Sequence, residues 1–346
     1  MLTLSDFDYS LPKELIAAYP PQDRPSARLL HANRESGKFA HHTFRDITDF
    51  LQAGDLLVLN NTKVVPARIF GKKETGGVVE GLLLKNLGED RWKVLVRPSG
   101  RVKKNAVITF GQNGVRISAE VLDDPGQDSG ERLLRFLGEE TGQKLKSIGH
   151  IPLPPYIDRE DTEIDRELYQ TVFAEKEGAV ASPTAGLHFD QGLLEAINKK
   201  GVETVCVTLH TGYGTFQPVT SENLSEHKMF EEEFEITEEA AGRINQAKQD
   251  NRRIIACGTT SVRALESAAG PDGKIIPQKS ATRLFVYPPY EFKIVQGLIT
   301  NFHLPKSSLL LLVAAFLGHD KMMKAYCEAI REKYRFYSYG DAMVIL

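Results

Sequence analysis

The sequence predicts an α/β main domain that is discontinuous in the chain and carries an inserted small all-β barrel domain. Short β-type runs follow one another between about 56 and 137 with no helical pattern between them, which is typical of a small barrel or sandwich. After the segment 151–157, strands and helices alternate, which favours an α/β body with a largely parallel sheet. We therefore assign 1–55 and 149–346 to the main domain and 56–148 to the barrel.

The predicted barrel contains six or seven strands separated by turn signals such as ETGG, NLGED, PSG and GQNG. The runs, in order, are LLVLN (56–60), VVPARIF (64–70), VVEGLLLK (78–85), RWKVLVR (91–97), AVITF (106–110), VRISAEV (115–121) and RLLRF (132–136).

The main domain begins with mixed short elements, including a short helix in LPKELIAAY that the prolines at 20–21 stop. Asp190 and Thr237 are predicted N-caps, and Gly201 ends the first of the two helices. The further elements are strands at 202–210, 230–236, 252–258, 284–288 and 297–302, a helix at 259–270, a buried helix SLLLLVAAFLG at 308–318 and a helix at 321–334.

The composition is that of an ordinary globular protein, with 346 residues, 41% hydrophobic and 26% charged. A net charge of −3 excludes binding to nucleic acid through overall charge, so any RNA contact must be local. Three cysteines without a C-x-x-C pair argue against a disulfide framework or a zinc site and favour a reducing cytosol. We expect no signal peptide at MLTLSDFDYS, and 308–318 is shorter than the roughly 18 residues of a membrane span. We therefore expect a cytoplasmic protein without membrane contact.

Ligands of open α/β sheets gather at the carboxyl ends of the strands, and four junctions of this kind carry reactive residue types. The first is ASPTAGLHF, in which a turn could present backbone N–H groups beside His188. The second is VTLHTGYGTFQPV, where glycines around an aromatic residue allow close approach to a flat ligand. The alternatives are an ordinary turn with a packed histidine and a plain glycine loop.

The third junction, IIACGTTSVRALES, places hydroxyls at a helix N-terminus, which suits a carboxylate, a phosphate or a ribose hydroxyl; simple N-capping is the alternative. The fourth, LITNFHLPKSSLLLL, sets a histidine beside an amide and an amine, which suits general acid or base work, or marks a structural histidine. Neither the phosphate-loop nor the dinucleotide fingerprint is present, so neither ATP nor NAD is implied. No H-E-x-x-H spacing occurs, and we predict no metal.

A local RNA contact is predicted at RPSGRVKKN, residues 97–105, where basic side chains gather in a turn between two barrel strands. A solvated hairpin turn is the alternative. The acidic segment MFEEEFE at 229–235 should not face RNA.

Taken together and in order, the four junctions and the closing YRFYSYGDAMVIL resemble the S-adenosylmethionine:tRNA ribosyltransferase-isomerase family of queuosine biosynthesis. FDYSLPKELIAAYP and NNTKVVPARIFG extend the resemblance over essentially the whole chain. It implies a bacterial cytoplasmic enzyme that uses S-adenosylmethionine as co-substrate, without a metal and without an obligate protein partner. The implied substrate is tRNA bearing 7-aminomethyl-7-deazaguanine at the wobble position, and the implied products are epoxyqueuosine, adenine and methionine.

The resemblance also assigns candidate residues to roles. Because the sulfonium acidifies the neighbouring ribose carbon, a base must remove a proton there and an acid should help adenine leave. The candidates for these two roles are His188, His210 and His303, which the sequence does not rank. The candidates for binding S-adenosylmethionine are Ser182, Thr184, Gly186, Gly212, Tyr213, Gly214, Thr215, Phe216, Gly258, Thr259, Thr260, Ser261, Arg263 and Asn301. The candidates for binding nucleic acid are Arg97, Arg101, Lys103, Lys104 and Lys306.

Three positions depart from the pattern of the family. Tyr213 stands in a segment that commonly reads V-G-A-G-T-F, Ser308 replaces a frequent threonine, and Phe230 occupies a place often held by histidine. Two other functions compete with the implied one: a different S-adenosylmethionine-dependent RNA enzyme such as a methyltransferase, and a non-catalytic RNA-binding protein that uses the barrel.

Overall fold

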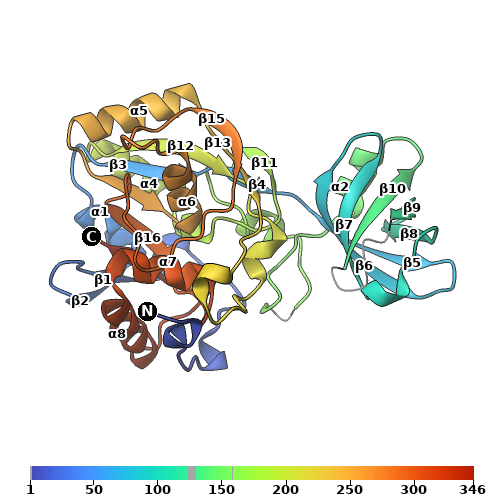
Figure 1. Cartoon of the computed structure of the whole chain (residues 1–346), viewed down its shortest axis with the longest axis horizontal. Coiled ribbons are helices and arrows are strands. Elements are labelled where there is room, and N and C mark those ends of the chain that lie inside the picture. The colour runs from blue at the N-terminus through green and yellow to red at the C-terminus, as the bar shows by residue number, and fades with distance from the viewer. Residues whose placement is uncertain (1, 124–129, 158) are drawn as a thin grey trace. The chain divides into compact units, whose positions relative to one another are not determined.

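The computed structural model describes residues 2–123, 130–157 and 159–346, which form two compact units (Figure 1). The larger unit comprises Met1–Lys63, Pro155–Arg159 and Glu167–Leu346, and the smaller comprises Val64–Pro154 and Glu160–Arg166. A discontinuous α/β unit thus surrounds an inserted barrel in the chain, which confirms the predicted fold class.

The larger unit is built on a nine-stranded mixed sheet with the order β15-β13-β12-β3-β14-β16-β17-β1-β2. Its central strands β12, β3, β14 and β16 are parallel, and the pairs toward both edges are antiparallel except for β1 with β17. The bounds are β1 (Arg28–Ala32), β2 (Phe39–Thr43), β3 (Leu56–Asn60), β12 (Glu203–Leu209), β13 (Glu232–Ile236), β14 (Ile254–Cys257), β15 (Gln278–Thr282), β16 (Gly297–Asn301) and β17 (Ala342–Ile345).

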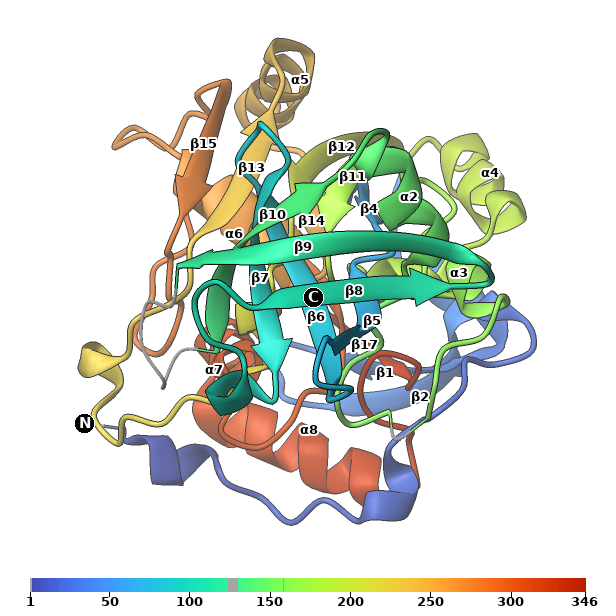
Figure 2. The ribbon, with the colours of Figure 1, turned by 90° about the vertical axis from the view of Figure 1, so that its right-hand side faces the viewer.

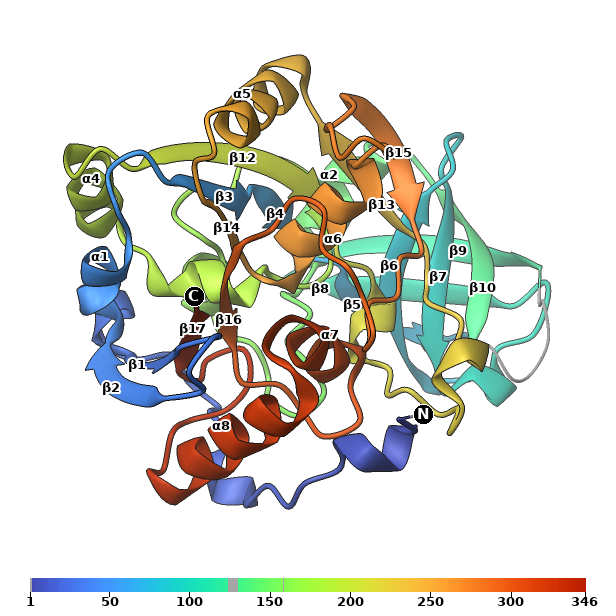
Figure 3. The ribbon, with the colours of Figure 1, turned by 60° about the vertical axis from the view of Figure 1, so that its left-hand side comes forward.

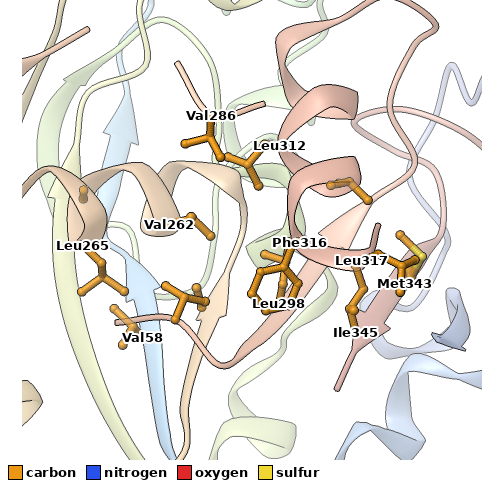
Figure 4. Close-up of a cluster of buried hydrophobic side chains, with 14 of the residues drawn as sticks. Val58, Val262, Leu265, Val286, Leu298, Leu312, Phe316, Leu317, Met343 and Ile345 are labelled. Carbon is orange, nitrogen blue, oxygen red and sulfur yellow. The ribbon is translucent and has the colours of Figure 1, made fainter. Parts of the chain in front are cut away.

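Helices cover both faces of this sheet because alternate residues of each central strand point to opposite faces. Leu56 and Val58 of β3 pack in the cluster that contains α5 (Glu238–Gln249), α6 (Thr259–Ala268), α7 (Ser308–Leu317) and α8 (His319–Arg331). Figure 4 shows part of this cluster, with side chains of α6 and α7 lying over β3, β16 and β17. Leu57 and Leu59 pack on the other face with α1 (Ile47–Phe50) and α4 (Gln191–Lys199).

The strand LLVLN at 56–60, which we expected to open the barrel domain, instead lies at the centre of the large sheet (Figure 3). All five of its residues are buried, which is typical of a parallel strand covered on both faces. A barrel strand alternates between buried and exposed positions, so the unbroken apolar run LLVL was the signal that separates this strand from those that follow it.

The smaller unit is a closed barrel with the order β10-β7-β6-β5-β8-β9 (Figure 2). Its strands alternate, so that Ile108 and Phe110 of β8 point into the barrel while Thr109 and Gly111 are exposed. The bounds are β5 (Arg68–Lys73), β6 (Val78–Asn86), β7 (Arg91–Arg97), β8 (Val107–Gln112), β9 (Val115–Asp123) and β10 (Glu131–Leu137), followed by α2 (Thr141–Ile148).

Both predicted N-caps are present: the side chain of Asp190 accepts from Leu193 N at 2.6 Å, and that of Thr237 accepts from Ala240 N at 3.2 Å. The predicted helix at LPKELIAAY is only a 3-10 turn, Lys13–Leu15. The predicted strand LFVYP is irregular, because Thr282 Oγ1 and the Arg263 guanidinium take the N–H and the carbonyl of Leu284. The remaining strands and α-helix of the described residues are β4 (Thr62–Val64), β11 (Lys176–Ala179) and α3 (Asp165–Leu168).

The apolar segment at 308–318 forms α7, whose residues from Leu310 to Ala314 are buried against the sheet. Among the residues described, no helix combines the length and the apolar character that crossing a bilayer requires.

Candidate functional site

A cavity of about 250 Å³ opens within the larger unit at the carboxyl ends of β12, β14 and β16. We call it the strand-end cavity. All four junctions singled out from the sequence contribute to its lining, through Ser182, Thr184, Thr211, Thr215, Gly258, Thr259, Thr260, Asn301 and His303. The parallel centre of the sheet brings the second, third and fourth junctions together, because strands that run in one direction end at one edge. The first junction instead follows β11 (Lys176–Ala179), which pairs with β4 in a separate two-stranded sheet.

The lining of the strand-end cavity holds buried hydroxyl groups without a hydrogen-bond partner among the residues that the structure describes. They belong to Tyr169, Ser182, Thr211, Thr260 and Tyr337. A buried hydroxyl without a partner costs about 1–3 kcal/mol, so such groups are uncommon in a core that serves packing alone. Five of them in one cavity give it a polar lining whose hydrogen bonds water or a polar ligand would complete.

The third junction ends β14 at Gly258, whose φ of +86° is a conformation that glycine adopts without strain. Gly258, Thr259 and Thr260 then line the cavity with the N-terminal turn of α6, where backbone N–H groups and the helix dipole favour an anion. Ser261 lies apart from the lining, since its hydroxyl donates to the Cys257 carbonyl at 2.7 Å.

Of the three candidate histidines, His303 is the one that lines the cavity. Its Nε2 lies 2.7 Å from Thr300 Oγ1, and its backbone N–H donates to the Tyr326 hydroxyl at 3.0 Å. Burial lowers the pKa of His303 to about 3, because a charged imidazolium would lose its hydration. The ring is therefore uncharged at neutral pH.

His188 lies behind the cavity wall rather than in it. Its Nε2 is 3.2 Å from Asn301 Nδ2, and its ring packs on Phe44 with 4.9 Å between centroids. Burial, with smaller contributions from the charges of Arg335 and Arg24, lowers the pKa of His188 to about 3. His188 therefore positions Asn301, which itself reaches the cavity.

His210 does not line the strand-end cavity, nor a second hollow beside it that is described below. Its Nδ1 is 2.7 Å from Thr62 Oγ1, and its ring packs directly on Gly178. Burial lowers the pKa of His210. The structure thus does not bring the three histidines together.

One wall of the cavity consists of residues that the sequence reasoning did not single out. Tyr156 and Tyr337 pack with ring centroids 3.9 Å apart, and the Tyr156 hydroxyl is hydrogen-bonded to Ser338 Oγ. Tyr337 has a φ of +76°, which is a strained conformation for a bulky residue and typical of functional positions. The closing motif YRFYSYGDAMVIL and the tyrosine of IPLPPYI were the available signals.

A second hollow, of about 340 Å³, adjoins the first, and Thr215, Gln217, Pro218 and Leu309 line both. We call it the side hollow. Arg263 and Glu232, both buried, form an ion pair in its wall, and Glu232 also accepts from Gly212 N at 3.0 Å. Arg263 Nε donates to the Leu284 carbonyl at 3.0 Å, while Nη2 is buried without a partner in the described structure.

Comparisons with known proteins decide the family. Residues 4–345 match the family described as queuosine biosynthesis protein. The chain belongs to this family. A curated relative from Sulfurihydrogenibium sp. is 50% identical over 346 residues, 100% of both chains, and one from Fusobacterium nucleatum is 50% identical over 343 residues, 99% of this chain and 96% of the relative. Both relatives are named S-adenosylmethionine:tRNA ribosyltransferase-isomerase.

A solved structure of an S-adenosylmethionine tRNA ribosyltransferase from Thermotoga maritima is 37% identical, with a TM-score of 0.55 over 99% of this chain and 100% of that one. The resemblance stated from the sequence motifs and the enzyme class that it implies are therefore confirmed. The role of each residue in this queuosine biosynthesis protein remains a prediction.

The predicted cofactor-binding residues Gly186, Gly212 and Tyr213 lie outside both linings. Gly186 serves close packing, since a Cβ there would lie 2.7 Å from Phe173 Cζ. Gly212 donates its N–H to Glu232, and Tyr213 opens the 3-10 turn Tyr213–Phe216. The side chain of Phe216 is outside the described part of the structure. Lys306, which was predicted to bind nucleic acid, forms an ion pair with Asp8 at 2.7 Å.

The basic segment 97–105 belongs to the barrel unit, where the predicted RNA-binding residues Arg97, Arg101, Lys103 and Lys104 are all exposed. The buried Arg132 holds this segment, since its guanidinium donates to the carbonyls of Val102 at 3.0 Å and Ser99 at 2.8 Å. The segment therefore presents its charges from a fixed turn.

Within 2–123, 130–157 and 159–346, no group of three or more histidine, cysteine or acidic residues is arranged to hold a metal ion. A reaction without a metal stays a prediction.

Proposed function

We propose that the protein transfers the ribosyl part of S-adenosylmethionine to the amine of 7-aminomethyl-7-deazaguanine at the wobble position of tRNA. The ribosyl group is isomerised in the reaction, which yields epoxyqueuosine in the tRNA and releases adenine and methionine. Membership of the queuosine biosynthesis family and the names of the relatives support this proposal.

The observation that carries the proposal is the set of unpartnered hydroxyls in the strand-end cavity, from Tyr169, Ser182, Thr211, Thr260 and Tyr337. S-adenosylmethionine offers ribose hydroxyls, adenine nitrogens and a carboxylate to such groups. Its carboxylate suits the N-terminal turn of α6, where Thr259 and Thr260 line the cavity.

His303 is the residue of this chain best placed for the proton abstraction that the reaction requires. It lines the cavity, and its Nε2 is held by Thr300 Oγ1. Burial lowers its pKa to about 3, so the ring is uncharged at physiological pH, and its work as a base requires that the bound substrates raise this pKa toward neutrality. The role of acid for the departing adenine falls to a different group.

The tRNA substrate would be attracted by the exposed basic residues of the segment 97–105, which neutralise phosphates without reading sequence. We place the enzyme in the cytoplasm, where its tRNA substrate is found. We assign it no metal and no obligate protein partner.

The test is incubation of the protein with S-adenosylmethionine and tRNA carrying the aminomethyl-deazaguanine, followed by chromatography of the small molecules and mass analysis of the nucleosides. We expect adenine, methionine and a heavier nucleoside in equal amounts. S-adenosylhomocysteine without free adenine would instead identify a methyltransferase, and tRNA binding without consumption of S-adenosylmethionine would identify a binding protein. Either result would overturn the proposal.

A further inference from the structure

An exposed aromatic side chain is fixed at the side hollow by a glycine. Phe230 is 48% exposed, and its ring lies directly on the backbone of Gly214. A Cβ at position 214 would overlap the ring at its Cγ and Cδ2 atoms. Both residues line the side hollow, so the second glycine of the segment TGYGTF makes room for this contact.

Some polar groups of the side hollow have hydrogen-bond partners in the described structure, and one does not. Both carboxylate oxygens of Glu232 are occupied, one by Gly212 N and the other by Arg263. Arg263 is 6% exposed, yet its Nη2 has no partner in the described structure. A buried guanidinium N–H without an acceptor is costly, so this N–H is available to an acceptor atom of a water or a ligand in the hollow.

We propose that the side hollow binds the acceptor base of the tRNA, the 7-aminomethyl-7-deazaguanine, with its ring stacked on Phe230. This inference rests on the proposed function and assigns the second substrate to a place. An exposed aromatic ring is the usual platform for an unpaired base, because every base has a flat face to stack. The O6 atom of the base is an acceptor of the kind that Arg263 Nη2 lacks.

The charge and the position of the hollow fit this base in two further ways. Its primary amine is protonated in solution, with a pKa near 10 as for lysine, and Glu226 lines the hollow as an acidic partner. The reaction requires the amine to approach the ribosyl carbon to about 3–3.5 Å, so the two substrates must share a wall. Thr215, Gln217, Pro218 and Leu309 form such a shared wall.

The test compares binding and turnover in Phe230→Ala, with an anticodon hairpin that carries the aminomethyl-deazaguanine and a matched hairpin with guanine. Stacking on one aromatic side chain is worth about 1–3 kcal/mol per base, so we expect the Kd of the modified hairpin to rise about 5- to 150-fold. The KM for tRNA should rise similarly, while the Kd for S-adenosylmethionine alone should stay within about twofold.

Two further variants test the ring of Phe230: one displaces it and the other retains it. Gly214→Ala introduces the Cβ that overlaps Phe230, so it should weaken hairpin binding as Phe230→Ala does. Phe230→Tyr keeps the ring and should bind within about twofold of the wild type. Tyr19→Ala is the matched control, because Tyr19 is 64% exposed and lines neither hollow.

The outcomes separate this inference from the proposed function. If wild-type protein releases adenine and Phe230→Ala binds the modified hairpin as well as the wild type does, the base is not stacked there and only the inference fails. If wild-type protein binds both hairpins equally and releases no adenine, the proposed function fails as well. A loss of hairpin binding in Tyr19→Ala equal to that in Phe230→Ala would also contradict the assignment.

Discussion

Asn301 Nδ2 lies 3.2 Å from His188 Nε2, and the two residues are 113 positions apart in the chain. The same amide donates to the Tyr337 carbonyl at 3.1 Å, and Asn301 Oδ1 accepts from the Thr184 hydroxyl at 3.0 Å. One buried side chain therefore joins the first junction, the fourth junction and the tyrosine wall of the strand-end cavity.

Replacing Asn301 by alanine should lower the free energy of unfolding, because it leaves buried polar groups of three neighbours without a partner at about 1–3 kcal/mol each. We expect a total loss of about 2–4 kcal/mol, measured by urea denaturation. Asn198→Ala, an exposed position on α4, is the control and should stay within about 0.5 kcal/mol. An equal effect of both variants would show that the network adds nothing.

His303→Ala should lower kcat by about 10²- to 10⁴-fold, the usual contribution of a general base, with a small effect on the Kd for S-adenosylmethionine. The matched variant is His210→Ala, which removes a half-buried histidine that lines neither cavity. It should retain kcat within about threefold, since it does not meet the reacting atoms. If His210→Ala lowered kcat more than His303→Ala in steady-state turnover, the assignment of His303 as the base would be contradicted.

The stability should fall as the pH falls through the range from about 6.5 to 3. Burial lowers the folded-state pKa of His188 and His303 to about 3, whereas histidine in an unfolded chain has a pKa near 6.5. Between these values the unfolded state binds more protons, so acid favours unfolding, and above pH 6.5 this effect is absent. Urea midpoints measured from pH 8 to pH 5 should decline, and the decline should be shallower in His188→Gln.

Tyr337→Phe should separate stability from activity. Its hydroxyl is buried without a partner in the described structure, so removing it should leave the Tm unchanged or raise it. If a ligand uses this hydroxyl, the Kd for S-adenosylmethionine should rise about 3- to 10-fold, the equivalent of one hydrogen bond. Tyr326→Phe is the contrast, because its hydroxyl accepts from His303 N, and its loss should lower the Tm.

Neutralising Arg101, Lys103 and Lys104 together should weaken tRNA binding and reduce its dependence on salt. Each phosphate contact contributes about 0.9 to the slope of log K against log salt on duplex and about 0.7 on single strands. The slope should therefore fall by about 2 to 3 if all three residues meet phosphates. Lys144 and Lys146 of α2 in the same unit provide a control pair, whose neutralisation should leave the slope nearly unchanged.

Several elements could be predicted from local signals. The caps Asp190 and Thr237 and the buried helix at 308–318 follow from short sequence patterns, as does the run of alternating strands in the barrel. The convergence of the second, third and fourth junctions on one cavity follows from a single rule, that parallel strands end at one edge. The first junction follows β11 of a separate two-stranded sheet, so its place at the cavity could not be predicted by that rule.

What the sequence did not reveal depends on partners that are far apart in the chain. The strand LLVLN belongs to the large sheet because β12 and β14, which are made much later, pair with it on both sides. LFVYP has strand-like residues, yet Arg263 and Thr282 occupy the backbone groups that a ladder would need. The three histidines look alike in sequence, and only their long-range neighbours distinguish the one in the cavity from the other two.

The pairing of β1 with β17 has a consequence for folding during synthesis on the ribosome. Leu29 aligns with Ala342 and Ala32 with Ile345. β1 is synthesised early, but it cannot form this pairing until β17, the last strand in chain order, has been synthesised. Until then β16 and β1 both lack the neighbour that separates them in the sheet order. The strands of the barrel are close in sequence, so the barrel can fold well before β17 is synthesised. The nascent chain would then carry a folded barrel while the large sheet is still incomplete.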